Sequence, residues 1–250
     1  MIPKIIHYCW FGCGEMPELV RRCMASWHQF MPDWQYMCWN EDNFDIESAP
    51  RYVREAYEVR KYAFVSDYVR LWALEQHGGV YLDTDVEVIQ PFDTLLDNCA
   101  FIGFEESKAK TLGTNVIGSE PHLSWLMMQM DYYNIAQFIR QDGTMDMTPN
   151  SEIIARNLVK GGLIRNGKEQ VINYQSAVNN NCELIHVYDF HYFSPITSTR
   201  VMRKNKHTFS IHHCYGSWIG YHAPRELCDS IIVREVINAL IQLKRLIIRK

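Results

Sequence analysis

The pattern of hydrophobic and polar residues divides the chain into two halves of different regularity. In the first half, short apolar runs alternate with longer segments in which apolar residues recur at helical spacing. This alternation predicts strands near 5–10, 34–39, 80–82, 86–89 and 100–104, and helices near 17–32 and 50–77. Strands separated by helices are typical of an α/β fold with a mostly parallel sheet.

The second half is less regular. Helices are expected over 121–133 and 151–159 and a strand over 208–212, whereas residues 161–200 are rich in loop-forming residues. Residues 225–250 have apolar positions at helical spacing and Arg and Lys concentrated at the end, which predicts a basic amphipathic helix. We expect this helix either to pack on the domain formed by residues 1–224 or to lie on a membrane surface.

Composition narrows the class of protein. With 250 residues, 47% of them hydrophobic, the chain can bury a sizeable core as one domain. The net charge of −4 argues against a nucleic-acid-binding protein. The eight cysteines form no CxxC pair, which indicates reduced thiols rather than a disulfide scaffold. No signal segment and no apolar run of membrane-spanning length is evident, so we expect a cytoplasmic protein, with the basic helix as its route to the inner face of the membrane.

The strongest local signal is the run Leu82-Asp83-Thr84-Asp85, which follows a Gly-Gly turn and a short apolar strand. Two carboxylates two residues apart can reach one divalent cation. Ligands of open α/β sheets bind beyond the carboxyl ends of strands, where these residues are expected. A solvated turn is the alternative. A calcium loop of EF-hand type is excluded, because Val88 and Thr94 stand where Gly and the bidentate Glu are needed.

A second candidate lies on the preceding helix. Asp67 and Arg70 are three residues apart and therefore share one face of the helix. Their spacing alone fits equally well a functional pair and a surface ion pair of little energetic value.

Five motifs in order resemble one enzyme family. They are the segments 2–7 with 10–12, 32–34 with 39–40, 61–70 (KYAFVSDYVR), 78–85 (GGVYLDTD), and 211–213 with 217–218. Together they resemble glycosyltransferase family 32, whose sugar-binding region contains a DXD motif and which includes mannosyltransferases and capsular-polysaccharide transferases. The catalytic core of the large clostridial glucosylating toxins is also similar. The resemblance covers roughly residues 2–220 and implies a GT-A-like, Rossmann-type sheet flanked by helices.

The resemblance implies a metal site that binds Mn²⁺ or Mg²⁺. Asp85 would bind the cation directly, and Asp83 would contact a metal-bound water or the ribose of the donor. His212 or His213 would complete the metal shell. Because consecutive residues of a strand point to opposite faces, only one of these two histidines should face the metal.

The resemblance also implies a binding site for a nucleotide-diphosphate sugar. Asp67 and Arg70 match residues that hold the hydroxyls of the donor sugar, and Tyr81 matches a residue near the diphosphate and the sugar. Trp10 matches an aromatic residue that stacks on the nucleotide base. Asn115 is a further candidate for a sugar contact.

The implied function is a metal-dependent, retaining transfer of a hexose to a hydroxyl of a glycan or lipid-linked glycan in polysaccharide or capsule biosynthesis. A C-terminal loop that carries Ser217 and Trp218 would close over the diphosphate. UDP-sugars are favoured as donors, and GDP-mannose remains open. The alternatives are a non-catalytic nucleotide-sugar or carbohydrate-binding protein and a metal-dependent nucleotide-sugar hydrolase.

Overall fold

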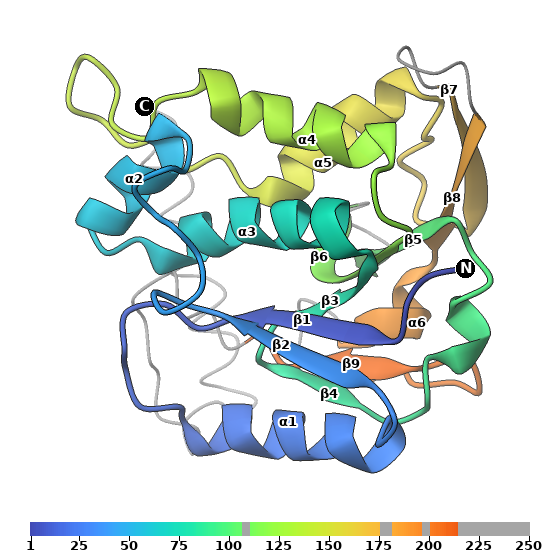
Figure 1. Ribbon diagram of the computed structural model, residues 1–250. Helices are drawn as coiled ribbons and strands as arrows, with labels where there is room; N and C mark the ends of the chain where they lie inside the picture. The colour runs from blue at the N-terminus through green and yellow to red at the C-terminus, as the bar shows by residue number, and fades with distance from the viewer. Residues whose placement is uncertain (107–110, 176–181, 197–200, 215–250) are drawn as a thin grey trace.

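A computed structural model of the protein describes residues 1–106, 111–175, 182–196 and 201–214 (Figure 1). The strands and helices expected in the first half are present, with their ends within two residues of those expected, except in the segment 50–77. The elements are β1 (Ile5–Cys9), α1 (Glu18–Phe30), β2 (Gln35–Trp39), α2 (Arg51–Glu58), α3 (Tyr62–His77), β3 (Gly79–Leu82), β4 (Val86–Val88), η1 (Asp93–Leu95), β5 (Ala100–Glu106), β6 (Thr111–Ser119), α4 (Ser124–Ile135), α5 (Asn150–Lys160), β7 (Gln170–Gln175), β8 (Cys182–Tyr188), α6 (Phe190–Phe193) and β9 (Ser210–His212).

Seven strands form one sheet in the order β2-β1-β3-β6-β5-β8-β7. Strands β1, β2, β3, β5 and β8 run in one direction, and β6 and β7 run in the other. Strands β4 and β9 form a separate antiparallel pair. The α/β class with a mostly parallel sheet is confirmed. Because the five parallel strands end at the same edge, the residues that follow them lie near one another.

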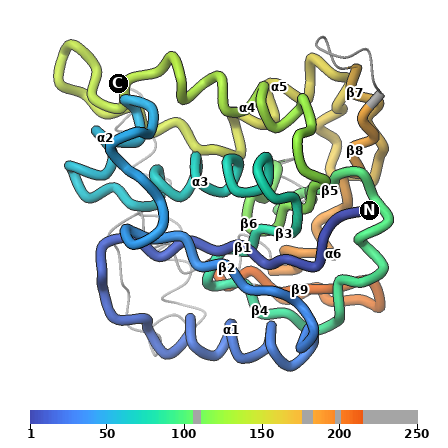
Figure 2. Tube along the Cα trace, in the orientation of Figure 1, coloured from blue at the N-terminus to red at the C-terminus, as the bar shows by residue number. Residues whose placement is uncertain are grey.

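Helices cover both faces of the sheet (Figure 1). Helices α2, α3, α4 and α5 lie on one face, where their apolar side chains share a core with the sheet. Helix α3 lies between the sheet and α4, which explains why it is apolar on most sides. The other face is covered by α1 and the β4–β9 pair, and Trp27 of α1 donates its indole N–H to the carbonyl of Val86 at 2.7 Å. The tube view follows the same path, with β9 beside β4 (Figure 2).

The segment 50–77, expected as one helix, is two helices. The chain turns at Arg60, which has a φ of 58°. The Lys61 N–H donates to the Ala56 carbonyl at 2.8 Å, and the Arg60 N–H donates to the Tyr57 carbonyl at 2.9 Å. This is the Schellman pattern that ends helices. The expectation of one unbroken helix was wrong, because no Gly or Pro in the sequence marks this helix end.

Residues 161–200, expected to be mainly loop, contain β7, β8 and α6. Strand β8 alternates in burial, with Ile185 and Val187 inward, but Glu183 also points inward and is 3% exposed. A carboxylate at a core position hides the hydrophobic alternation that identifies a strand. Its oxygens accept the backbone N–H groups of Ser124 and Trp125 at 2.6 and 2.9 Å, so Glu183 caps the first turn of α4.

Residues 215–250, which include Ser217, Trp218 and the expected C-terminal helix, lie outside the described residues. Among the residues that are described, no helix has both the length and the apolar character that crossing a membrane requires.

Candidate functional site

The candidate site lies at the edge where the parallel strands end. Asp83 follows β3, and its N–H donates to the carbonyl of Asn115 in β6 at 2.9 Å. The Val86 N–H donates back to the Asp83 carbonyl at 3.0 Å. The two hydrogen bonds fix a tight turn that joins β3 to β4 and carries Asp85.

Arg70 of α3 holds two acidic residues of the site together. The Arg70 side chain is 6% exposed, and its Nη2 lies 2.9 Å from Oδ1 of Asp67 and 3.4 Å from Oδ1 of Asp83. Its Nη1 donates to the Thr114 carbonyl at 2.8 Å. The Asp67–Arg70 pair is therefore a buried ion pair and not a surface one.

Tyr81 contacts both Arg70 and Asp83. The guanidinium carbon of Arg70 lies 4.6 Å from the centre of the Tyr81 ring, and the Tyr81 hydroxyl donates to Oδ1 of Asp83 at 3.0 Å. Tyr81 is 2% exposed. The structure thus places it where it orients Asp83.

His212 is the histidine that faces the two aspartates. Its Nε2 lies 3.4 Å from Oδ1 of Asp85, and ligand atoms of Asp83, Asp85 and His212 all lie within 4.8 Å of one another. The pairing of β9 with β4 fixes this orientation, because it sets His212 opposite Val86. His213 points the other way, and its Nε2 lies 2.8 Å from Oε2 of Glu87.

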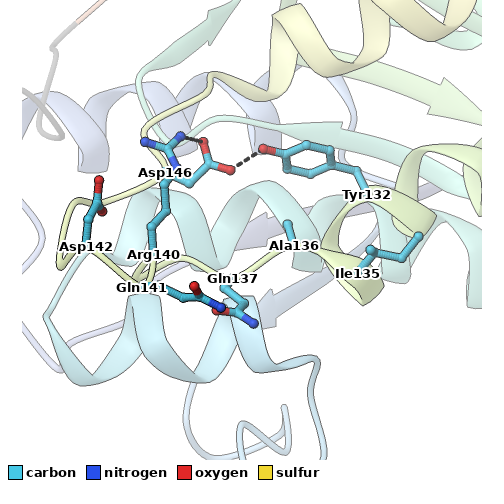
Figure 3. Close-up of a pocket in the computed structure, with 8 residues that line it drawn as sticks. All are labelled: Tyr132, Ile135, Ala136, Gln137, Arg140, Gln141, Asp142 and Asp146. Atoms are coloured by element: carbon cyan, nitrogen blue, oxygen red, sulfur yellow. Dashed lines mark hydrogen bonds and ion pairs between the residues drawn. The ribbon is translucent and has the colours of Figure 1, made fainter.

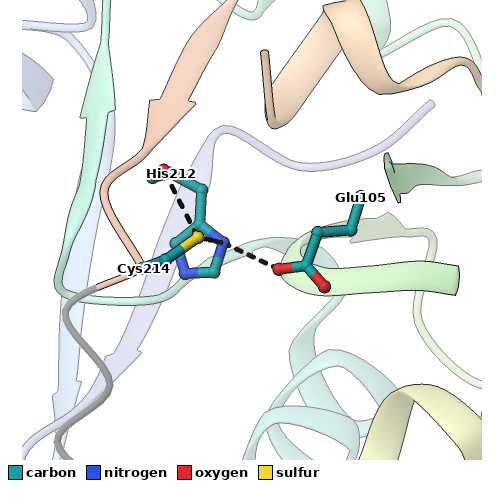
Figure 4. A group of neighbouring side chains, drawn as sticks. All are labelled: Glu105, His212 and Cys214. Carbon is teal, nitrogen blue, oxygen red and sulfur yellow. Dashed lines mark hydrogen bonds and ion pairs between the residues drawn. The ribbon is translucent and has the colours of Figure 1, made fainter. Parts of the chain in front are cut away.

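Two further side chains approach His212 that the sequence did not indicate as site residues (Figure 4). The His212 Nδ1 lies 3.2 Å from Oε1 of Glu105 and 3.5 Å from Sγ of Cys214. The expected strand 100–104 ends one residue before Glu105, so the rule of the carboxyl strand ends could have identified this residue. No comparable signal identifies Cys214.

Trp10 and Asn115 lie at the same edge of the sheet. Trp10 follows β1, is half-buried, and donates its indole N–H to the Gly14 carbonyl at 2.7 Å. Asn115 is 2% exposed, and its Oδ1 accepts the Ser194 hydroxyl at 3.2 Å. Among the described residues its buried Nδ2 has no hydrogen-bond partner. A polar group of this kind is available to a ligand oxygen.

Burial and crowding of like charges perturb the acidic groups. Burial raises the pKa of Asp67 to about 6, although the positive charge of Arg70 acts in the opposite direction. Burial also raises the pKa of Asp83, with a further contribution from Asp85. Burial alone would lower the pKa of His212, but Cys214 and Asp85 raise it well above its ordinary value. These shifts indicate that the group of Asp67, Asp83, Asp85 and His212 favours a positive charge at its centre.

The donor set fits a divalent cation. Carboxylate oxygens with one imidazole suit Mn²⁺ and Mg²⁺, and both Asp83 and Asp85 lie on a backbone turn held by hydrogen bonds. The residues present could therefore hold such an ion between Asp85 and His212.

A hollow elsewhere on the surface has no part in this cluster (Figure 3). It lies beside the end of α4 and is lined by Tyr132, Ile135, Ala136, Gln137, Arg140, Gln141, Asp142 and Asp146. Its principal polar groups satisfy one another, because Asp146 pairs with Arg140 at 3.0 Å and accepts the Tyr132 hydroxyl. We assign it no role.

Comparison with known proteins identifies the region that carries Asp83 and Asp85. Residues 17–102 match the model of a family described as "Glycosyltransferase sugar-binding region containing DXD motif". An inositol phosphoceramide mannosyltransferase of Schizosaccharomyces pombe is 30% identical over 120 residues, which are 47% of this chain and 33% of that protein. An uncharacterized glycosyltransferase of Acanthamoeba polyphaga mimivirus is 29% identical over 161 residues, which are 59% of this chain and 60% of that protein.

Among solved structures, the chain is similar to one described as "PaToxG Glycosyltransferase", with a TM-score of 0.50 and 15% identity over 64% of this chain and 69% of that one. This likeness confirms the expected GT-A-like fold. The chain spans about a third of the length of the mannosyltransferase that it matches.

Proposed function

We propose that the chain, whose residues 17–102 match the model of glycosyltransferase sugar-binding regions that contain a DXD motif, transfers a hexose from a nucleotide-diphosphate sugar to a hydroxyl group. The observation that carries the proposal is the meeting of Asp83, Asp85 and His212 at the carboxyl end of β3. This is the place where an open α/β sheet binds its ligand. The proposed acceptor is a glycan or a lipid-linked glycan.

Charge balance supports dependence on a divalent cation. Asp67, Asp83 and Asp85 bring three carboxylates together, and Arg70 is the cation that the described residues place between Asp67 and Asp83. Asp85 faces the imidazole of His212. Mn²⁺ or Mg²⁺ held by Asp85 and His212 would bring the cluster close to neutrality and would stabilise the negative charge of a leaving diphosphate.

The surrounding residues suggest how the donor is held. Arg70 already uses its N–H groups on protein partners, so we assign it the positioning of Asp67 and Asp83. Asp67 remains the residue proposed to accept the sugar hydroxyls, with the Nδ2 of Asn115 as a donor to a sugar oxygen. Trp10, half-buried at the end of β1, is proposed to stack on the base.

The proposed reaction retains the anomeric configuration. The acceptor oxygen forms a bond to the anomeric carbon on the face from which the diphosphate departs. The bond from that carbon to the phosphate oxygen breaks with its electron pair, and the departing oxygen takes the proton of the acceptor hydroxyl. Asp83 and Asp85 hold the leaving side of the site in place, and Asp67 orients the sugar.

The first test is release of nucleotide from UDP-glucose, UDP-galactose and GDP-mannose, with Mn²⁺ or with a chelator. GDP-mannose belongs in the screen because the relative in Schizosaccharomyces pombe is named an inositol phosphoceramide mannosyltransferase, and a relative in Saccharomyces cerevisiae is named a mannosyl phosphorylinositol ceramide synthase. We expect one donor to be cleaved slowly and only with the metal, and faster when an acceptor sugar is added. Release that ignores the chelator would indicate a metal-independent hydrolase, and no release from any donor would indicate a binding protein.

Variants assign the activity to the site. Asp85→Asn should lower the rate by about 100-fold or more, since it removes charge stabilisation of the leaving group. Asp93→Asn removes an exposed carboxylate paired with Lys4 and should leave the rate unchanged. His212→Ala should lower the rate far more than His213→Ala, because only the His212 ring faces Asp85. Equal rates for Asp85→Asn and the wild type would refute the proposal.

We also propose that the chain meets a lipid-linked acceptor at the cytoplasmic face of a membrane through residues 225–250. Two observations support this: the basic amphipathic pattern of the segment, and the names of relatives that act on inositol phosphoceramide. The chain should sediment with anionic vesicles, and Arg245→Glu with Arg249→Glu should abolish this binding. Failure of the wild type to bind such vesicles would instead favour packing of the helix on the domain.

A further inference from the structure

The imidazole of His212 faces a second set of metal-binding atoms on the side away from the aspartates. Its Nε2 faces Asp85, whereas its Nδ1 faces Oε1 of Glu105 at 3.2 Å and Sγ of Cys214 at 3.5 Å (Figure 4). The three ligand atoms of Glu105, His212 and Cys214 lie within 4.8 Å of one another. This set includes a thiol, which the aspartate side lacks.

The distances match those between ligands of a tetrahedral zinc ion. Bonds of about 2.1 Å to nitrogen and oxygen and about 2.3 Å to sulfur, at tetrahedral angles, separate nitrogen from oxygen by about 3.4 Å and nitrogen from sulfur by about 3.6 Å. The observed separations at His212 are 3.2 and 3.5 Å. Both separations at His212 thus fit a zinc ion, and three protein ligands would leave its fourth position for water.

The chemistry of the donors separates the two sides of the ring. A thiolate selects zinc and similar thiophilic cations, whereas paired carboxylates suit Mn²⁺ and Mg²⁺. On zinc binding the Cys214 thiol would lose its proton to solvent. The side chains of Glu105 and His212 are 36% and 14% exposed, so an ion can enter from solvent.

We propose that Glu105, His212 and Cys214 form a zinc-binding site that competes with the cation of the aspartate cluster for His212. A neutral imidazole coordinates through one nitrogen and keeps its proton on the other. When zinc occupies Nδ1, the proton lies on Nε2, which then donates to Asp85 and has no lone pair for a second ion. Zinc would thus act as an inhibitor. The binding site stands on geometry alone, and only the inhibition rests on the proposed function.

The test of the site is optical and does not need activity. Cobalt(II) replaces zinc, and a thiolate ligand gives an intense charge-transfer absorption in the near ultraviolet. We expect this band in the wild type and in Cys99→Ser, in which a half-buried cysteine outside the cluster is changed. The band should be absent in Cys214→Ser. An equal band in Cys214→Ser, or no band in the wild type, would overturn the site.

Affinity and inhibition complete the test. Loss of an outer-shell partner weakens metal binding by about 10- to 100-fold, and loss of a direct ligand should cost at least as much in Cys214→Ser and in Glu105→Gln. If the donor-cleavage assay is positive, zinc should inhibit the wild type and Cys99→Ser, and a correspondingly higher zinc concentration should be needed for Cys214→Ser. Inhibition at the same zinc concentration in all three would overturn the competition. A cobalt band that depends on Cys214, with no cleavage of any donor, would uphold the site and overturn only the proposed function.

Discussion

Replacing Arg70 with Met should destabilise the protein far more than replacing an ordinary helix arginine. Arg70 is the cation between Asp67 and Asp83, and its side chain is 6% exposed. Methionine fills much of the same space but leaves both carboxylates without their counter-charge. Removal of one member of a buried ion pair costs about 3–5 kcal/mol, because the remaining charge stays out of water without compensation.

Arg51 provides a matched control. It also forms an ion pair within a helix, with Glu55 at 2.6 Å, but its side chain is 58% exposed. Its partner Glu55 is 13% exposed and also accepts the Ile139 N–H, so loss of the solvent-screened Arg51 should cost about 0–1 kcal/mol. Arg51→Met should therefore change the free energy of unfolding by less than about 1 kcal/mol, although both variants lose one arginine from one helical ion pair.

Urea unfolding and thermal melting measure the difference. At roughly 2–4 °C per kcal/mol for a chain of this length, Arg70→Met should melt about 6–20 °C below the wild type. Adding Asp67→Asn should recover part of the loss by removing one uncompensated charge. If Arg70→Met does not fold, Arg70→Lys serves instead. It keeps the charge but cannot serve both carboxylates and the Thr114 carbonyl, so a smaller loss is expected. Equal losses for the Arg70 and Arg51 variants would refute the reasoning.

Three further predictions concern the core. Burial lowers the pKa of His7 from 6.5 to about 4, so below pH 6.5 the unfolded chain takes up a proton that the folded chain does not. The contribution of His7 to the free energy of unfolding should fall by about 1.4 kcal/mol per pH unit down to about pH 4. In urea titrations His7→Gln should show a shallower fall with pH than the wild type; identical pH slopes of the two proteins would contradict this. Glu183→Gln leaves one N–H at the start of α4 without an acceptor and should cost about 1–3 kcal/mol, with faster amide exchange at Ser124 and Trp125; unchanged exchange would argue against the cap. Gly118→Ala places a methyl group 2.0 Å from the Phe101 ring and should cost about 1–3 kcal/mol in thermal melts, whereas a wild-type melting temperature would show that the ring can move aside.

The fold could be predicted from the sequence where each element carries its own signal. Strand β3 and helix α1 have compact apolar patterns bounded by Gly or Pro, and both are where they were expected. Prediction failed where the surrounding structure, and not the local sequence pattern, determines the conformation or the burial of a residue. Arg60 takes a left-handed conformation that Gly normally takes, and Glu183 occupies a core position because it caps α4. Neither reason is visible in the neighbouring sequence.

The candidate site could likewise be predicted only where a local sequence pattern indicates it. The position of Asp83 and Asp85 at a strand end follows from a local pattern, whereas the depth at which Arg70 is buried depends on the packing of α3 against β3 and β6. The spacing of Asp67 and Arg70 therefore left open the alternative of a surface ion pair, and the structure excludes it. Ser217 and Trp218 lie outside the described residues, so their proposed roles remain predictions.

The choice between His212 and His213 shows why the rest of the site needed the structure. Strand alternation requires the two rings to diverge, but it does not say which one faces the aspartates. That depends on the register of β9 on β4, where His212 pairs with Val86 and the His213 N–H donates to the Asp85 carbonyl at 3.1 Å. A shift of one residue would exchange the two rings and would move Cys214 away from Glu105. The register of β9 on β4 therefore determines both which histidine faces the aspartates and whether Cys214 lies near Glu105. The two proposed metal sites lie on opposite sides of the His212 ring.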